Sequence, residues 1–154
     1  MKRIVGVVQE QMFRPDALRR LKAGLKAIYR AHDPSERVVV LFMVVPPGYA
    51  YSERKPSEAT ILVIEVDDGT AQSKREAMMA DFSRLLLDDF RVSPLDNVIT
   101  VADTSFVSAF FDAQRNRIDR SQRLRINARL YGAALLSRLR EGYLRLPMKL
   151  TPEH

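Results

Sequence analysis

Cysteine is absent from the 154-residue chain, and histidine occurs only at positions 32 and 154. Without cysteine the protein can form no disulfide bond, no thiolate metal site and no cysteine nucleophile. His32 and His154 have no acidic neighbours at metal-ligand spacing, so we expect neither a metal nor a cofactor. His32 is better interpreted as a cation at the end of a helix, where positive charge is favourable.

Long apolar runs are also missing from the start of the chain. The run at residues 4–8 is short, whereas a signal peptide needs about 7–15 apolar residues and a membrane span about 20. We therefore expect a cytoplasmic protein with no membrane partner. The motifs G-x-S-x-G, G-x-G-x-x-G, H-E-x-x-H and the P-loop do not occur, so hydrolase, dinucleotide, zinc-protease and NTPase interpretations have no support.

The composition, 46% hydrophobic and 29% charged, is typical of one globular domain with a core. The net charge of +6 is unevenly distributed. Residues 113–154 hold ten Lys and Arg against three acids, which makes this segment +7 and leaves residues 1–112 at −1. Any argument for a polyanionic partner therefore concerns the last quarter of the chain.

The first half has the pattern of a strand, a helix and a second strand. Residues 4–8 and 38–45 are apolar runs typical of strands that are covered on both faces. Between them, Pro15 suits the first position of a helix, and leucines follow at spacings of three or four residues. Pro34 ends that helix.

The second half repeats this order after a polar loop or short hairpin at residues 49–58. Residues 60–66 and 98–102 are predicted strands, and an amphipathic helix between them ends at Ser93-Pro94. Two right-handed β-α-β units predict an α+β domain with a four-stranded mixed sheet and both helices on one face. The other face would be bare and apolar, which favours a symmetric oligomer.

The basic end of the chain, residues 113–154, is predicted to be a helical extension of the domain at residues 1–112. Its helix should cover residues 116–141 and stop at Gly142. The arginines are scattered around this helix, so nucleic-acid binding is the weaker interpretation. We favour a helix that packs along a neighbouring subunit.

The stretch from Phe90 to Asp103, FRVSPLDNVITVAD, resembles a turn, a strand and a closing acid of the tautomerase superfamily. Met43-Val-Val-Pro46 and the strand from Thr60 are similar to two further strands of that family. The resemblance is to the branches of macrophage migration inhibitory factor and malonate semialdehyde decarboxylase, and it covers about residues 1–112. It implies a homotrimer with active sites between subunits.

The family's base is an amino-terminal proline in an apolar pocket, which removes a proton from carbon beside a carbonyl group. This chain has Met1 at the corresponding position and Lys2 after it, so the catalytic candidate is the primary amine of Met1. A chain-terminal amine has a reference pKa of about 7.7–8.0, which suits a weak base. Val98 replaces the tyrosine that lines the pocket in one branch.

The resemblance also suggests residues that bind the substrate's carboxylate. Arg54 and Lys55 precede the third strand, near an arginine of the decarboxylase branch, and Arg37 precedes the second strand. Phe110 and Phe111 follow Asp103 where the family places aromatic residues over its pocket. Each of these residues also has a plain structural interpretation, as a solvated charge or as packing.

Three hypotheses follow from these features. The first is a tautomerase-like trimer with unconventional activity on a small oxo- or enol-carboxylate, in which the Met1 amine is the base and Arg54 or Lys55 holds the anion. The second hypothesis is an inactive trimer of the same fold with a binding or structural role. The third is an anion-binding protein that works through its basic extension.

Overall fold

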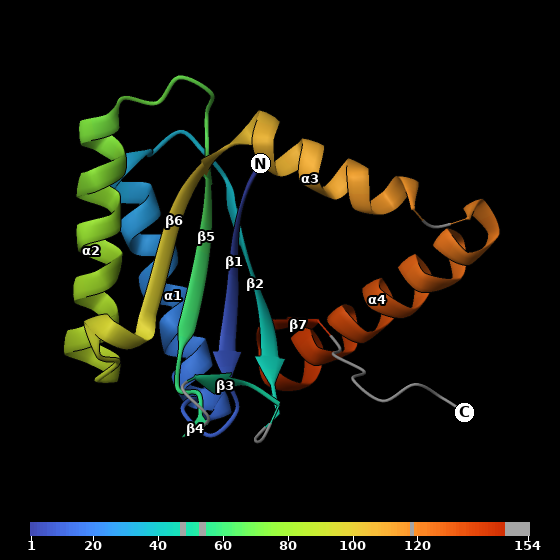
Figure 1. Cartoon of the computed structure of the whole chain (residues 1–154), viewed down its shortest axis with the longest axis horizontal. Helices are drawn as coiled ribbons and strands as arrows, with labels where there is room; N and C mark the ends of the chain where they lie inside the picture. Colours follow the sequence, from blue (N-terminus) through green and yellow to red (C-terminus); the bar gives the residue numbers. More distant parts are fainter. Residues whose placement is uncertain (47–48, 53–54, 118, 147–154) are drawn as a thin grey trace.

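The computed structural model describes residues 1–46, 49–52, 55–117 and 119–146. Strands and helices alternate through most of this part of the chain (Figure 1). In chain order the elements are β1 (Lys2–Gln9), α1 (Pro15–His32), β2 (Val38–Val45), β3 (Tyr51–Ser52), β4 (Lys55–Pro56), β5 (Thr60–Val66), α2 (Gln72–Phe90), the 3₁₀ turn η1 (Pro94–Asp96), β6 (Asn97–Asp103), α3 (Thr104–Asn116), α4 (Arg120–Glu141) and β7 (Leu144–Leu146).

The main sheet has the strand order β6-β5-β1-β2-β7 among the described residues. Each repeat contributes one parallel pair, β1 with β2 and β5 with β6, and the two repeats join through the antiparallel pair β1–β5. The predicted α+β fold of two β-α-β units is confirmed. The sheet differs from the prediction in having a fifth strand, because β7 returns from the end of the chain and pairs in parallel with β2.

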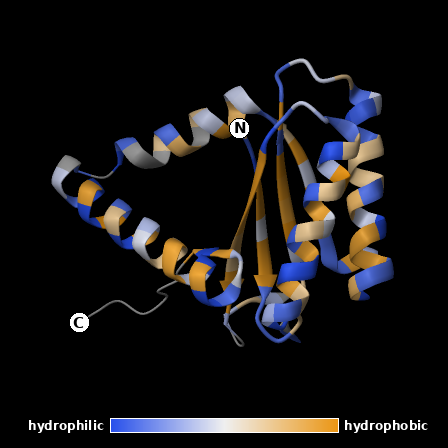
Figure 2. Cartoon of the chain, turned by 180° about the vertical axis from the view of Figure 1, so that it is seen from behind, coloured by the Kyte–Doolittle hydropathy of each residue, from blue (hydrophilic) through white to orange (hydrophobic). Residues whose placement is uncertain are grey.

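Helices α1 and α2 lie side by side on one face of this sheet, as predicted (Figure 1). The apolar stripe of α1 is buried, with Leu18, Leu21 and Leu25 at most 1% exposed. It packs against alternate strand residues such as Phe42 and Ile64, which are fully buried. Apolar residues gather on the strands and on the inner sides of these helices (Figure 2). The core therefore lies between the helices and the sheet.

The helix ends follow local chemistry. Pro15 occupies the start of α1, where its missing N–H costs no hydrogen bond. Helix α4 ends at Gly142, whose φ of 80° is in the left-handed region that favours glycine. Helix α2 also ends in the left-handed conformation, at Arg91 with φ 59°.

The opposite sheet face is formed by the other set of alternating strand residues. In the register of the sheet, Val5 lies between Leu41 on β2 and Val63 on β5, and Val7 lies between Met43 and Ile61. The edge strand β6 leaves Val98 53% exposed. We call this surface the open face. It is largely apolar, as the sequence predicts.

The end of the chain forms an extension of two helices and a strand, residues 104–146, which we call the arm. Its helix α4 confirms the predicted C-terminal helix, whereas α3 is an additional helix that begins directly after β6. The arm projects beyond the β2 side of the sheet, on the side away from α2 (Figure 1). Its end returns to α1, where Arg19 and Lys22 donate hydrogen bonds to the carbonyls of Glu141 and Gly142. Helix α3 runs across residue 112, and the division into units 1–112 and 113–154 remains a proposal.

The arm is anchored at its far end by β7. The Tyr143 ring packs edge-on against Phe42 with ring centroids 5.8 Å apart. Burial and the nearby Glu141 raise the pKa of Tyr143 to about 12. Ser137 Oγ accepts a hydrogen bond from the backbone N–H of Arg145 at 2.8 Å. No helix in the described ranges is both long enough and apolar enough to cross a membrane.

Candidate functional site

The start of β1 lies beside the start of β2, because these two strands are parallel and in register from Lys2 and Val38 onward. The backbone N–H of Lys2 donates to the carbonyl of Arg37 at 2.8 Å and extends the pairing by one residue. Two of the residues predicted for the site, Met1 and Arg37, are thereby brought together. Parallel pairing places the first residues of both strands at one edge of the sheet.

The amine of Met1 has one charged neighbour in this arrangement. Its nitrogen lies 3.7 Å from Oε2 of Glu36, within ion-pair distance. Met1 is 79% exposed in the single chain, and Glu36 is half-buried. A carboxylate beside the amine differs from the apolar pocket that the family resemblance implies.

A groove of ≈ 480 Å³ adjoins Met1, and its lining is rich in cations. Lys26 and Arg30 contribute from α1, and Arg37 contributes from the turn before β2. With the Met1 amine these groups carry four positive charges against the one negative charge of Glu36. The other lining residues are Pro34, Ser35, Val38 and Val39. We call this cavity the Met1 groove.

Such a lining suits a small anion that has a carboxylate group. Guanidinium groups bind carboxylates through paired hydrogen bonds, and lysine adds a mobile point charge. Val39 is half-buried and offers apolar surface to the carbon part of a ligand, whereas Val38 is buried in the core. The groove thus joins an amine, several anion-binding groups and an apolar wall.

The sequence argument missed Lys26, Arg30 and Glu36. Lys26 and Arg30 are four residues apart on α1, so they share one helix face, and Glu36 directly precedes Arg37. The spacing of the two cations was visible in the sequence. That they face Met1 was not visible, because this depends on the way α1 packs against the sheet.

A second group of charges lies beside Met1 on the open face. Arg3 donates two hydrogen bonds to Glu65 across β1 and β5, at 2.7 and 3.3 Å. The Arg3 guanidinium also sits 5.1 Å from the centre of the Phe111 ring, at a distance favourable for a cation–π contact. Phe111 is therefore placed at the Met1 end of the sheet, over Arg3.

The Arg3–Glu65 pair shifts the pKa values of both groups. Burial acts to raise the pKa of the Glu65 carboxyl, but the hydrogen bond and charge of Arg3 outweigh it, so the pKa lies below its ordinary value. The hydrogen bond to Glu65 raises the pKa of Arg3. Both groups thus remain charged at neutral pH.

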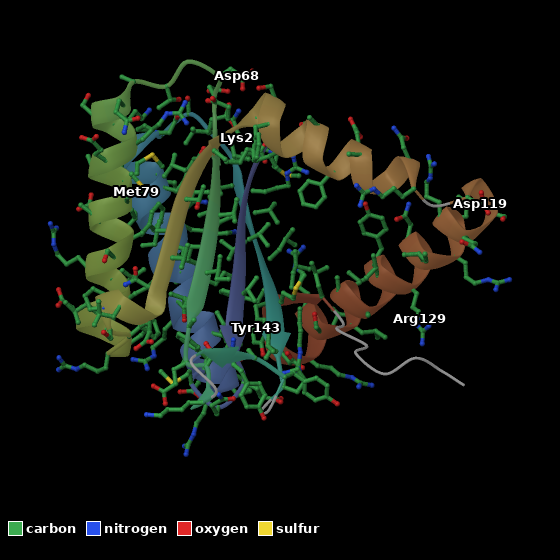
Figure 3. The ribbon with its side chains drawn as sticks, in the orientation of Figure 1. Lys2, Asp68, Met79, Asp119, Arg129 and Tyr143 are labelled. Atoms are coloured by element: carbon green, nitrogen blue, oxygen red, sulfur yellow. The ribbon has the colours of Figure 1, made fainter. Side chains whose placement is uncertain are left out.

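Lys2 is held by α3 and by the turn after β5. Its ammonium donates to Asp67 and, at 2.7 Å, to Oγ1 of Thr104. Burial opposes the charge of Lys2, yet the hydrogen bond and charge of Asp67 prevail and raise the pKa of Lys2. Figure 3 shows Lys2 and Asp68 at the end of the sheet where α3 begins. Lys2 therefore fixes the start of β1 and, with it, the position of Met1.

The other predicted site residues are distributed differently. Lys55 lies on β4, at the end of the sheet opposite Met1 (Figure 1), so one chain does not bring the two residues together. Arg54 lies outside the described residues, as does the side chain of Phe110. Within the part of the chain that the structure describes, no three His, Asp or Glu residues are placed to hold a metal ion.

Solved structures with the same fold were found, although no protein-family profile and no curated protein sequence match the chain. The structure of Ps01740 is similar with a TM-score of 0.62 and 17% identity, covering 68% of this chain and 96% of that one. A member of the cis-3-chloroacrylic acid dehalogenase family, N1, matches with a TM-score of 0.59 and 11% identity, covering 66% and 73%. A fused 4-OT trimer matches with a TM-score of 0.57 and 7% identity, covering 66% and 84%.

These structures are members of the tautomerase superfamily, and the likeness confirms that this chain has a tautomerase-like fold. The matches leave about a third of the chain uncovered. At such low identity the likeness carries the fold and no particular activity.

Proposed function

We propose that this protein is a tautomerase-superfamily homotrimer that binds a small oxo- or enol-carboxylate in the Met1 groove and moves a proton on it. The observation that carries this proposal is the shared lining of that groove, to which Met1, Lys26, Arg30 and Arg37 all contribute. The tautomerase-like fold supports it.

In the proposed reaction the neutral Met1 amine takes a proton from the carbon beside the substrate's carbonyl group. The electron pair of the broken C–H bond moves to the carbonyl oxygen and gives an enolate, and the amine becomes an ammonium group. Glu36, 3.7 Å away, stabilises that ammonium. Return of the proton to oxygen or to a neighbouring carbon completes a tautomerisation, while the arginines hold the carboxylate.

The trimer in this proposal forms through the open face. A largely apolar sheet surface is unfavourable in water and is suited to a symmetric interface between subunits. Three similar solved structures are described as trimers of fused 4-OT. In this trimer a neighbouring subunit covers the exposed Met1 and brings its own Lys55 to the groove, since Lys55 lies at the opposite end of the sheet from Met1 within one chain.

A second candidate function is a trimeric binding or structural protein of the same fold. The observation in its favour is the surroundings of Met1, which is 79% exposed and ion-paired with Glu36. These open, polar surroundings differ from the closed apolar pocket in which the family holds its amine base. This candidate retains carboxylate binding and loses proton transfer.

The two functions are separated by measuring turnover and binding on the same samples. Ketonisation of phenylenolpyruvate and of 2-hydroxymuconate reports proton transfer, and calorimetry with the same compounds reports binding. Amino-terminal acetylation removes the base and leaves the fold intact. Turnover that acetylation abolishes supports the enzyme, and binding without turnover supports the second function.

Glu36→Gln provides a further check on the same assays. If the Met1 amine is the base, loss of the Glu36 carboxylate removes the group that stabilises the ammonium formed in the reaction, so turnover should fall while binding is retained. An Arg20→Ala variant is the matched control, because Arg20 lies on α1 outside the groove lining. If the native protein shows no binding and no turnover, both functions are refuted.

A further inference from the structure

Helix α4 carries an apolar stripe that its own chain leaves in water. At about 100° per residue, the stripe residues fall within one narrow arc of the helix. Four of them are exposed by 58–75%: Leu124, Tyr131, Leu135 and Leu139. Ala128 is exposed in the same arc. Large apolar residues gathered in this way mark an interaction surface.

A different face of α4 holds the helix to its own chain. Ala134 and Ser137 are buried there, and Ser137 also bonds to β7. They lie roughly a quarter turn or more around the helix from the stripe. The exposed stripe is therefore additional to the surface that anchors the arm.

We propose that this stripe docks on a second copy of the chain, in the acidic groove between α1 and α2. That groove has a volume of ≈ 270 Å³ and an apolar floor of Ile28 and Leu85. Carboxylates line its rim: Asp81, Asp88 and Asp89, with Arg84 among them. The proposal does not depend on the proposed reaction.

Charge complementarity selects this partner surface. Arg125 and Arg129 flank the stripe on one side, and Arg138 flanks it on the other. Asp88 and Asp89 form no ion pair within the described part of the chain. The helix and the groove are therefore complementary in charge, arginine against aspartate, and both have an apolar centre. Two α4 helices packed on each other would instead bring their arginines together.

The groove receives about half of the stripe. Its lining on α2 runs from Asp81 to Asp89, about 12 Å at 1.5 Å per residue, whereas the stripe from Leu124 to Leu139 is about 22 Å long. Helices α1 and α2 approach closely where Gly24 faces Leu85, since a Cβ on Gly24 would lie 2.9 Å from Leu85 Cδ1. Leu85 also lines the groove, so the groove lies where the two helices meet.

The acceptor must belong to another copy. Within one chain the sheet stands between α4 and α2 (Figures 1 and 2), and the hydrogen bonds from α1 reach α4 at its end, at Glu141 and Gly142. The similar solved structures cover 66–68% of this chain, so the fold match does not account for the remaining third. The contact is therefore one that this chain adds to the shared fold.

Cysteine cross-linking tests the contact directly, because the native chain has no cysteine. Two single variants, Leu135→Cys and Asp88→Cys, are co-expressed, and one of them carries a carboxy-terminal tag so that mixed and self products differ in mass. Mild oxidation should give the mixed product as the main disulfide, since a disulfide requires Cα atoms about 4.4–6.8 Å apart.

Ile126→Cys is the matched control on α4. It is 40% exposed and lies on the side of the helix opposite the stripe, so its mixed product with Asp88→Cys should be at least fivefold weaker. Equal yields for Ile126 and Leu135 would overturn the proposal. A dominant Leu135–Leu135 product would also overturn it, because that product indicates that two α4 helices pair with each other. The same holds if no mixed product forms and the native protein sediments with anionic vesicles, which indicates a membrane surface as the partner.

Discussion

The guanidinium of Arg3 and the carboxylate of Glu65 are joined by two hydrogen bonds, at 2.7 and 3.3 Å, across the antiparallel pair β1–β5. Glu65 is 3% exposed, so its charge depends on this partner. The pair lies on the otherwise apolar open face, beside the start of β1. The pair therefore holds β1 to β5 at the end of the sheet where Met1 lies.

Arg3→Met should destabilise the protein by about 3 kcal/mol, because the buried Glu65 carboxylate loses its ion-pair partner and keeps only the weaker influence of Thr104 and Lys2. The double variant Arg3→Met/Glu65→Leu should recover most of that loss, since both charges are then gone. Urea unfolding followed by circular dichroism measures the two values. A double variant as unstable as the single one would show that the loss comes from packing.

The same pair predicts a loss of stability in acid. The pKa of Glu65 is lower in the folded protein than in the unfolded chain, where it is about 4.3. The unfolded state therefore binds this proton more tightly, so the stabilisation is complete above about pH 4.3 and is lost as pH falls through the folded pKa.

Urea midpoints at pH 7 and pH 3 test this effect. Glu65→Gln should be less stable than the native protein at pH 7 and should lose less stability between the two values. Parallel losses in both proteins would assign the acid sensitivity to other carboxylates.

The cations of the Met1 groove should each contribute modestly to carboxylate binding. Arg30→Ala and Arg37→Ala should weaken binding about threefold to fivefold each, the range of exposed ion pairs. Raising the ionic strength should reduce the native affinity by screening the same charges. Calorimetric titration with 2-hydroxymuconate measures both effects.

Arg20→Ala is the control for this titration, because Arg20 is on the same helix but packs over the Phe90 ring. Its affinity should equal that of the native protein. An equal loss in Arg20→Ala and Arg30→Ala would mean that net charge, not the groove, determines binding.

Two glycines should respond in opposite ways to the same substitution. A Cβ at Gly6 would lie 3.0 Å from Cδ1 of Phe42 and 3.3 Å from Cδ2 of Leu62, both fully buried, so Gly6→Ala should cost about 1–3 kcal/mol. A Cβ at Gly132 in α4 meets nothing within 4 Å. Gly132→Ala should therefore raise stability by up to about 1 kcal/mol through helix propensity.

Thermal unfolding of the two variants checks this pair. Stabilisation by Gly6→Ala would contradict the close packing of β1 against Phe42. Destabilisation by Gly132→Ala would show that a contact outside the single chain fills the space at that position.

Much of the fold could be predicted from local pattern. Apolar runs of strand length, helical spacing and the breaks at Pro34 and Pro94 are properties of neighbouring residues, and they located both repeats correctly. The stop at Gly142 was predicted for the same reason, and a short hairpin at β3–β4 was one of the two alternatives for residues 49–58. Helix α3 was missed because it begins directly after β6, without a turn between them.

The candidate site was predicted only in part. Met1 and Arg37 meet because each begins one strand of a parallel pair, and the repeat pattern implied that pairing. Lys26 and Arg30 join them through the rotation of α1 about its axis, which depends on how Leu21 and Leu25 pack on the sheet. Lys55 was expected nearby and lies at the other end of the sheet.

The sequence by itself determined the order of elements, the burial pattern along each of them and the chemistry that is excluded, because these depend on residue type and short-range spacing. The tertiary structure decided the partners of two charged groups, Met1 with Glu36 and Arg3 with Glu65. It also decided that β7 pairs with β2. Such partners are far apart in the chain and are chosen by sheet register and helix packing. Residue spacing does not encode that choice, because many registers satisfy the same alternation of apolar and polar side chains.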